Sequence, residues 1–181
     1  MITRRQSLLL LSGGLATSTL GQGTEEATGD TGHLQLQIPP SVSNEDQMRL
    51  TLSQMYFVIT NDTKERQGIW QDSCSWGWQA PEVQITVQGT TFSFQKPLKQ
   101  WKRNFPDPYY IDPHSHYVLP INLLGPEWTE VKDLERLSGV SALITATFTI
   151  HPSKEAVRLK IWTGRLKAEI RAFVDIPSHP K

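Results

Sequence analysis

The segment 112–116 contains two histidines, His114 and His116, at a spacing that on a strand would turn both imidazoles to one face. Such pairs occur in zinc sites of β proteins, but a zinc site needs at least three protein ligands. Nothing in the sequence requires a third ligand to approach, although three groups could do so in space: His33, His151 and Asp72. Because Pro113 favours a turn, we predict that His114 is a turn residue and that the chain has no metal site.

Nucleophilic catalysis also lacks support in the sequence. The chain has no Gly-x-Ser-x-Gly elbow, and its single cysteine, Cys74, has no flanking base that would hold it as a thiolate. One cysteine can form neither an internal disulfide nor a cysteine-based zinc site. We predict that Cys74 packs as a small apolar side chain, that the protein has no cofactor and that it is not an enzyme.

Aromatic side chains are the other residues that could contact a ligand. The segment 69–78 holds three of the six tryptophans among Asp, Ser and Gly, and a second aromatic-rich stretch follows at 96–113. Rings in such loops either plug the end of a β core or offer their faces to a ligand. The ligand-binding candidates are therefore Trp70, Trp76, Trp78, Trp101 and Tyr109.

Among these rings we expect Trp76 to close the core, because a domain of many short strands needs bulky side chains at its ends. Gly77 would let the backbone pass close to this ring, and Cys74 would lie behind it. Trp70 or Trp78 would stay partly exposed.

The charge of the chain argues against a nucleic-acid partner. Lys plus Arg and Asp plus Glu both number 18, so the chain has no basic field that would favour nucleic acid. One local group of basic and aromatic residues superficially resembles a surface for single-stranded nucleic acid: Lys96, Lys99, Lys102, Arg103, Trp101 and Phe105. In an exported protein of near-neutral charge, we interpret this group as a solvated loop.

The N-terminal residues 1–21 have the features of an export signal. Arg4 and Arg5 precede a mildly apolar stretch that is too short and too weak to span a bilayer stably. Residues 3–8 resemble the twin-arginine export motif, and the ordinary secretory pathway stays open as an alternative. Cleavage after Gly21 would leave 22–32 as a disordered leader and 33–181 as a domain in the periplasm or outside the cell.

Alternating apolar and polar residues predict most of this domain as strands. The expected strands are 34–38, 48–58, 66–70, 83–87, 91–94, 116–123, 140–150 and 157–174. The clearest hairpin joins the fourth to the fifth through Gln88-Gly89, where Gly89 supplies a positive φ.

The remaining segments are less regular. The segment 96–113 has four prolines and should cross the surface between sheets. Apolar residues at every third position over 128–137, between a proline and a glycine, predict one short helix. Within 157–174 the apolar set moves from odd to even positions, so we predict a β-bulge at Thr163-Gly164.

About eight short strands and one minor helix predict an antiparallel β-sandwich of immunoglobulin-like type. Three short motifs within residues 48–166 resemble landmarks of an uncharacterised family of exported bacterial β-sandwich proteins: Cys74-Ser75-Trp76-Gly77, Trp101 with Asn104-Phe105-Pro106, and Ile161-Trp162-Thr163-Gly164. This resemblance implies an immunoglobulin-like domain and assigns no activity.

Two classes of function are compatible with these observations. The first is a non-enzymatic interaction or structural module with an unknown protein or polysaccharide partner. The second is a carbohydrate-binding module, because tryptophan and tyrosine rings stack on sugar faces. A proteinase inhibitor of sandwich type is a third idea. Exposure separates the first two, since coplanar exposed indoles favour sugar binding and buried indoles favour the interaction module.

Overall fold

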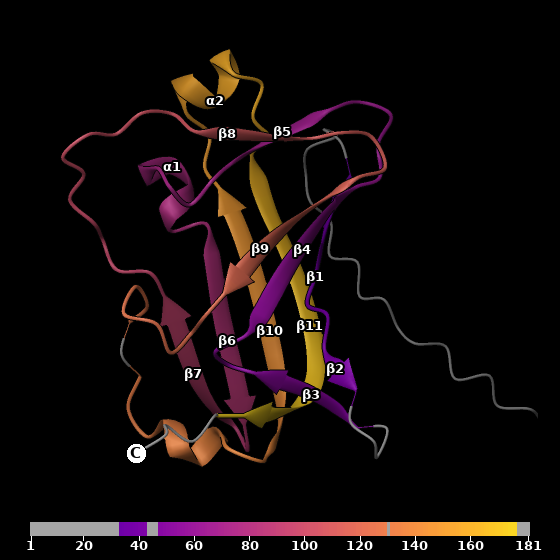
Figure 1. Cartoon of the computed structure of the whole chain (residues 1–181), viewed down its shortest axis with the longest axis vertical. Coiled ribbons are helices and arrows are strands. Elements are labelled where there is room, and N and C mark those ends of the chain that lie inside the picture. The colour runs from indigo at the N-terminus through magenta and orange to yellow at the C-terminus, as the bar shows by residue number, and fades with distance from the viewer. Residues whose placement is uncertain (1–32, 43–46, 130, 177–181) are drawn as a thin grey trace, which may run out of the picture.

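The computed structural model describes residues 33–42, 47–129 and 131–176. The predicted export signal and leader lie outside these ranges. Within them the protein is mostly β, with two sheets packed face to face around one hydrophobic core (Figure 1). The prediction of an all-β fold is therefore confirmed.

The two main sheets differ in size. The smaller sheet has the order β1-β4-β9 and the larger has the order β2-β3-β11-β10-β6-β7. The strands of the smaller sheet are β1 (Leu34–Gln37), β4 (Met55–Asn61) and β9 (His116–Ile121). Those of the larger sheet are β2 (Ser41–Val42), β3 (Met48–Thr51), β11 (Gly164–Asp175), β10 (Ser141–Ile150), β6 (Pro81–Val87) and β7 (Thr90–Gln95). Neighbouring strands are antiparallel except for β11 and β3, which are parallel.

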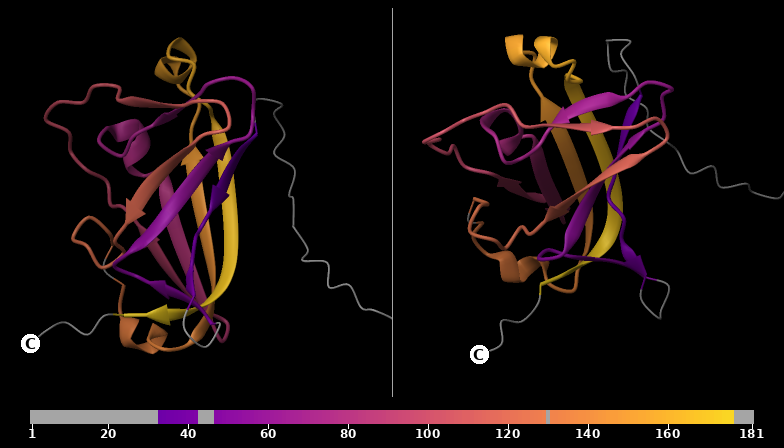
Figure 2. Two further views of the ribbon diagram at one scale, coloured as in Figure 1. Left: turned by 45° about the vertical axis from the view of Figure 1, so that its right-hand side comes forward. Right: turned by 45° about the horizontal axis from the view of Figure 1, so that its top comes forward.

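A two-stranded ribbon crosses one end of the sandwich (Figure 1, Figure 2). Its strands are β5 (Gln67–Trp70) and β8 (Pro108–Ile111). The helical elements are short: α1 (Ser75–Trp78), a 3-10 turn η1 (Leu134–Leu137) and α2 (Lys154–Arg158). Among the described residues, no helix has the length and apolar character needed to cross a membrane.

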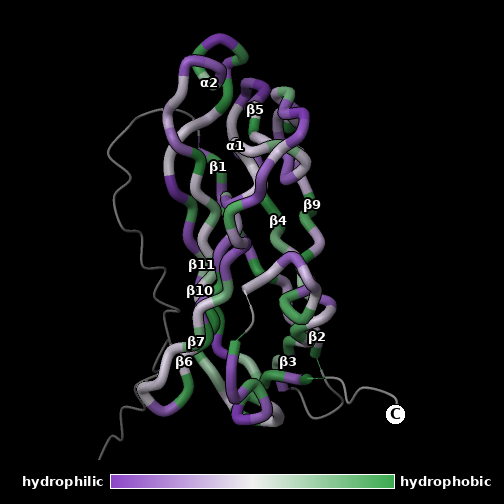
Figure 3. The backbone as a smooth tube through the Cα atoms, turned by 90° about the vertical axis from the view of Figure 1, so that its left-hand side faces the viewer, coloured by the Kyte–Doolittle hydropathy of each residue, from purple (hydrophilic) through white to green (hydrophobic). Residues whose placement is uncertain are grey.

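Alternation along the strands places the core between the sheets, and Figure 3 shows this change between hydrophobic and hydrophilic positions. In β10 the inward positions, such as Ile144 and Phe148, are buried against β4, where Phe57 and Ile59 are fully buried. The predicted strands at 34–38, 116–123 and 140–150 are confirmed. The hairpin is confirmed too, since the turn between β6 and β7 has positive φ angles at both central residues, as a type I′ turn requires.

The prediction of one long strand at 48–58 is wrong, because the segment divides between the two sheets. The backbone N–H of Gln54 donates to the carbonyl of Thr51 at 3.0 Å, which closes a turn between β3 and β4. This turn moves the buried set from even positions such as Leu52 to odd positions such as Met55. Tyr56 consequently faces outward, although its parity matches that of the buried residues in β3.

The predictions for 157–174 are also wrong in part. Residues 154–158 form α2, and the Ser153 hydroxyl accepts a hydrogen bond from the backbone N–H of Ala156 at 3.0 Å, which caps the helix. The strand begins only at Gly164 and pairs with β10 without interruption as far as Phe173, so it contains no bulge. The change from helix to strand explains the shift in the apolar pattern.

Two less regular segments also differ from expectation. The stretch 96–113, predicted to be a simple surface crossing, includes β8, which pairs with β5. The helix predicted over 128–137 is reduced to the single turn η1. Trp128 and Leu137, at the two ends of the segment 128–137, are nevertheless buried. The apolar spacing therefore reflects packing against the core without a regular helix.

Gly164→Val should lower the free energy of unfolding by about 1 to 3 kcal/mol. Gly164 has a φ of +149°, and an added Cβ would lie 2.8 Å from the side chain of Trp162. Urea unfolding would measure the loss. Arg171→Val, at an exposed position of the same strand, is the control and should change the free energy by less than about 0.5 kcal/mol. Equal costs for the two variants would contradict this account.

Candidate binding surface

The five aromatic candidates lie at the end of the sandwich that carries the ribbon. Trp70 is 1% exposed, and the two residues before it in β5, Gly68 and Ile69, are buried as well. Trp76 is only partly buried, and its ring lies 5.6 Å from that of Trp70 at an angle of 32°. The prediction that Trp76 is the largely buried ring is therefore wrong. Trp70 closes the core, and Trp76 covers it from outside.

The residues 70–79, here called the tryptophan segment, turn tightly after β5. The backbone N–H of Trp78 donates to the carbonyl of Cys74 at 2.9 Å, which closes the single turn of α1. A Cβ added to Gly77 would lie 2.0 Å from the carbonyl oxygen of Gln71. A close backbone passage thus exists at Gly77, but the neighbour is the backbone of Gln71, where the sequence had predicted the Trp76 ring. Cys74 is buried as predicted, and its thiol donates to the same carbonyl at 3.3 Å.

Trp78 and Trp101 meet edge to face, with ring centroids 6.1 Å apart and an interplanar angle of 84°. The ammonium group of Lys99 lies 4.4 Å from the ring centroid of Trp78 and 4.5 Å from that of Trp101. The ammonium group of Lys96 lies 4.3 Å from the same Trp78 ring. The two indoles are therefore perpendicular and in contact with the protein's own cations, and they do not form a flat platform.

The prediction that the basic residues form one solvated loop is wrong for Lys96, which is buried. Its side chain is 2% exposed, and its ammonium group lies 2.9 Å from a carboxylate oxygen of Asp72 and 3.6 Å from one of Glu127. The two carboxylates and the neighbouring indoles take the place of water around the buried charge. A sequence signal for this burial exists, because Lys96 continues the inward alternation of Phe92 and Phe94 in β7.

The residues 97–106, here called the basic loop, are fixed to the tryptophan segment at both ends. At the first end, the indole N–H of Trp78 donates to the carbonyl of Pro97 at 2.7 Å. Near the second end, the backbone N–H of Ser75 donates to the Asn104 side chain at 3.0 Å. The carboxylate of Asp107 then accepts hydrogen bonds from the side chains of Gln71 and Ser73. The base of the loop is thus held by direct bonds.

Between these anchors the basic loop projects apolar and cationic side chains into solvent. Leu98 is 88% exposed and Phe105 is 74% exposed. Three cations stand between them in the sequence, Lys99, Lys102 and Arg103, and the loop contains no Asp or Glu. Sequence reasoning noted these cations and Phe105 but missed Leu98. The sequence signal for the exposure of Leu98 was its place in a stretch with neither strand nor helix periodicity, where no regular element would bury it.

Tyr109 belongs to a different part of this end. Its ring lies 4.6 Å from that of Tyr117 in β9, and no ring contact joins it to the tryptophans within the described ranges. Burial, and then the charges of Asp72, Tyr109 and Asp107, raise the pKa of Tyr117 above the ordinary tyrosine value. Tyr117 therefore stays protonated at neutral pH and supplies packing rather than charge.

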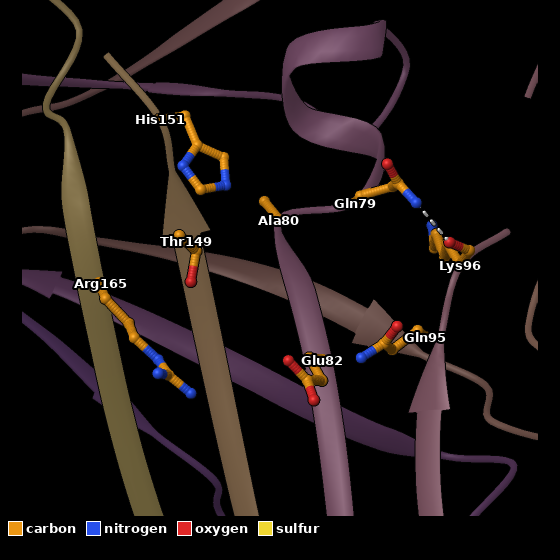
Figure 4. Close-up of a pocket in the computed structure, with 8 residues that line it drawn as sticks. All are labelled: Gln79, Ala80, Glu82, Gln95, Lys96, Thr149, His151 and Arg165. Atoms are coloured by element: carbon orange, nitrogen blue, oxygen red, sulfur yellow. Dashed lines mark hydrogen bonds between the residues drawn. The ribbon is translucent and has the colours of Figure 1, made fainter. Parts of the chain in front are cut away.

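An open groove of about 520 Å³ lies beside the tryptophan segment on the outer face of the larger sheet. Figure 4 shows its polar lining, which comes from four neighbouring strands and includes Glu82, Thr149, His151 and Arg165. The Glu82 carboxylate accepts a hydrogen bond from Gln84 at 3.0 Å. The groove therefore presents side chains of both charges to solvent.

The histidine pair lies away from these features. His114 occupies the turn predicted for it, with a φ of +54°, and His116 begins β9. In the described part of the chain, no three side chains of His, Cys, Asp or Glu gather in a way that could hold a metal ion.

No protein-family model, curated protein or solved structure matches this chain. Its function must therefore be inferred from the geometry of the surface formed by the basic loop and the tryptophan segment.

Proposed function

We propose that this protein is an exported, non-enzymatic β-sandwich of immunoglobulin-like type that binds a component of the cell envelope through the basic loop. The observation that carries this proposal is the exposure of Leu98 and Phe105 on a loop whose base is fixed by hydrogen bonds and by the buried Lys96. Exposed large apolar side chains that are rigidly presented are typical of interaction surfaces.

The same geometry supports an interaction module over a carbohydrate-binding module. Stacking on sugars needs exposed ring faces in one plane. Trp70 is buried, Trp78 and Trp101 are perpendicular, and Lys99 contacts both of those rings. Tyr109 is engaged with Tyr117. The aromatic candidates therefore mainly build the base that holds the basic loop in place.

Export through the twin-arginine route is part of this proposal, and it is supported by Arg4 and Arg5 ahead of a weak apolar stretch. Replacing both arginines by lysine should stop the appearance of processed protein outside the cytoplasm, because lysine keeps the positive charge but breaks the motif. Cell fractionation and blotting would measure this. Undiminished export of the double variant would contradict the twin-arginine route and favour general secretion.

Retention on isolated envelopes tests the binding role. The double variant Leu98→Ser/Phe105→Ser should be retained at least about tenfold more weakly than wild type, because it loses the two apolar contacts of the basic loop. Val42→Ser is the matched control, since Val42 is 67% exposed in β2 at the opposite end of the sandwich (Figure 1). Sedimentation with washed envelopes would measure retention. Equal retention of wild type and the double variant would contradict the proposed binding surface.

A further inference from the structure

We infer that the basic loop docks on the surface of an anionic phospholipid bilayer, with Leu98 and Phe105 entering the interface and the three cations facing the lipid head groups. This inference rests on the proposed function and names the ligand of the same surface. In Figure 1 the loop is the segment between β7 and β8, which extends outward beyond α1.

The charge around the loop favours an anionic surface. Lys99, Lys102 and Arg103 form no salt bridge among the described residues, so even Lys99, which contacts the rings of Trp78 and Trp101, keeps an uncompensated charge. Three acidic groups lie at the base of the loop: Asp72 and Glu127, which share the single positive charge of Lys96, and Asp107, which accepts hydrogen bonds from the neutral side chains of Gln71 and Ser73. The three positive charges of the loop exceed the two negative charges left at its base, so the tip is locally positive although the whole chain has a formal net charge of +0. Basic residues close to an anionic leaflet each strengthen binding about fivefold, equivalent to about 1 kcal/mol.

The apolar residues complete the surface. Leu98 and Phe105 are among the most exposed large apolar side chains of the described chain, and they lie on either side of the cations in the sequence. Aromatic and aliphatic side chains are stabilised at the boundary between head groups and acyl chains. Stable attachment to a bilayer commonly needs two signals, and the basic loop combines a basic one with an apolar one.

The fixed base of the loop lowers the cost of docking. Because hydrogen bonds from Trp78 and Ser75 already hold Pro97 and Asn104, binding needs little further ordering of the backbone. The two apolar side chains are exposed on a loop that extends outward beyond α1 (Figure 1), and a soft, extended surface can meet such a loop without supplying a matching pocket. A bilayer is therefore favoured over a protein or a polysaccharide.

Sedimentation with lipid vesicles tests this inference on the purified protein without its export signal. Wild type should bind vesicles of phosphatidylcholine with added phosphatidylglycerol at least about tenfold more tightly than vesicles of phosphatidylcholine alone. The triple variant Lys99→Gln/Lys102→Gln/Arg103→Gln should lose about 100-fold of this affinity, as about fivefold per residue requires. Leu98→Ser/Phe105→Ser should lose at least about tenfold while keeping the preference for the anionic lipid.

Two control variants distinguish an effect of the basic loop from an effect of surface charge or surface hydrophobicity elsewhere on the protein. Arg165→Gln/Lys167→Gln/Arg171→Gln removes the same charge from the exposed face of β11 and should change vesicle binding less than about threefold. Val42→Ser should leave it unchanged. Thermal unfolding would establish that each variant is folded, and all the substituted side chains lie on the surface.

Several outcomes would overturn the inference. They are equal binding to both kinds of vesicle, an equal loss for the triple variant and its charge control, or binding to soluble polygalacturonate without binding to vesicles. Retention on envelopes that depends on the basic loop, without vesicle binding, would overturn the bilayer as ligand and leave the proposed function standing. Absence of both kinds of binding would overturn both proposals.

Discussion

Trp70→Ala is expected to lower the free energy of unfolding by about 3 to 5 kcal/mol, the usual cost of truncating a core aromatic residue. Trp70 is the largest of the fully buried side chains, and the cavity left behind would lie beneath Trp76 at the end of the sandwich. The surrounding strands are fixed by β-pairing and can collapse only partly. Chemical unfolding of the variant and of wild type would measure the loss.

Two companion variants sharpen this test. Trp76→Ala should cost only about 1 to 2 kcal/mol, because Trp76 is partly buried. Trp70→Phe should cost less than Trp70→Ala, because the phenyl ring fills part of the space and removes an indole N–H that has no hydrogen-bond partner among the described residues. If Trp76→Ala proved at least as costly as Trp70→Ala, Trp70 would not be the ring that closes the core.

Gly77→Ala is expected to cost about 3 kcal/mol or more, because the added methyl group meets backbone atoms that cannot yield. Its Cβ would lie 2.0 Å from the carbonyl oxygen of Gln71 and 3.0 Å from the carbonyl carbon of Trp70. Relief of this clash would separate α1 from the end of β5 and disturb the anchors of the basic loop. Thermal and urea unfolding would measure the effect.

Gly89→Ala is the matched glycine control for this prediction. Gly89 has a φ of +83° in the hairpin turn, but an added Cβ there meets no atom within 4 Å. Its replacement should therefore cost only about 1 kcal/mol through backbone strain. Similar losses at the two positions would show that close backbone passage at Gly77 is not what constrains the tryptophan segment.

Local sequence was sufficient to predict the strands in which apolar and polar residues alternate without a break. The alternation in β10 and the glycine turn between β6 and β7 depend on residues close in the chain, and both predictions are confirmed. The break between β3 and β4 was missed because apolar residues stand on both faces of the segment, so parity alone does not reveal the turn at Thr51 to Gln54. The helix α2 was missed because alternation was given more weight than Ser153, a favourable N-cap residue.

The candidate surface depended more on contacts between distant residues. The burial of Trp70 depends on β8, which lies about forty residues further along the chain and pairs with β5, the strand that ends at Trp70. Lys96 is buried because Asp72 and Glu127 approach it from two other segments. Its residue type alone assigns Lys96 to the surface, although the alternation that begins in β7 places it inward. Sequence reasoning therefore pointed to segments that meet at this end of the sandwich, but it misjudged which of their side chains are buried.

The place of β11 within the larger sheet has a consequence for the order in which the domain can fold. β11 is the last strand of the described chain, yet it pairs with β10 on one side and with β3, from near the start of the domain, on the other. Until β11 has left the ribosome, β3 has no partner in the centre of the sheet and β10 has an open edge. The larger sheet therefore stays incomplete until β11 has been made, so the sandwich can close only after that strand is available.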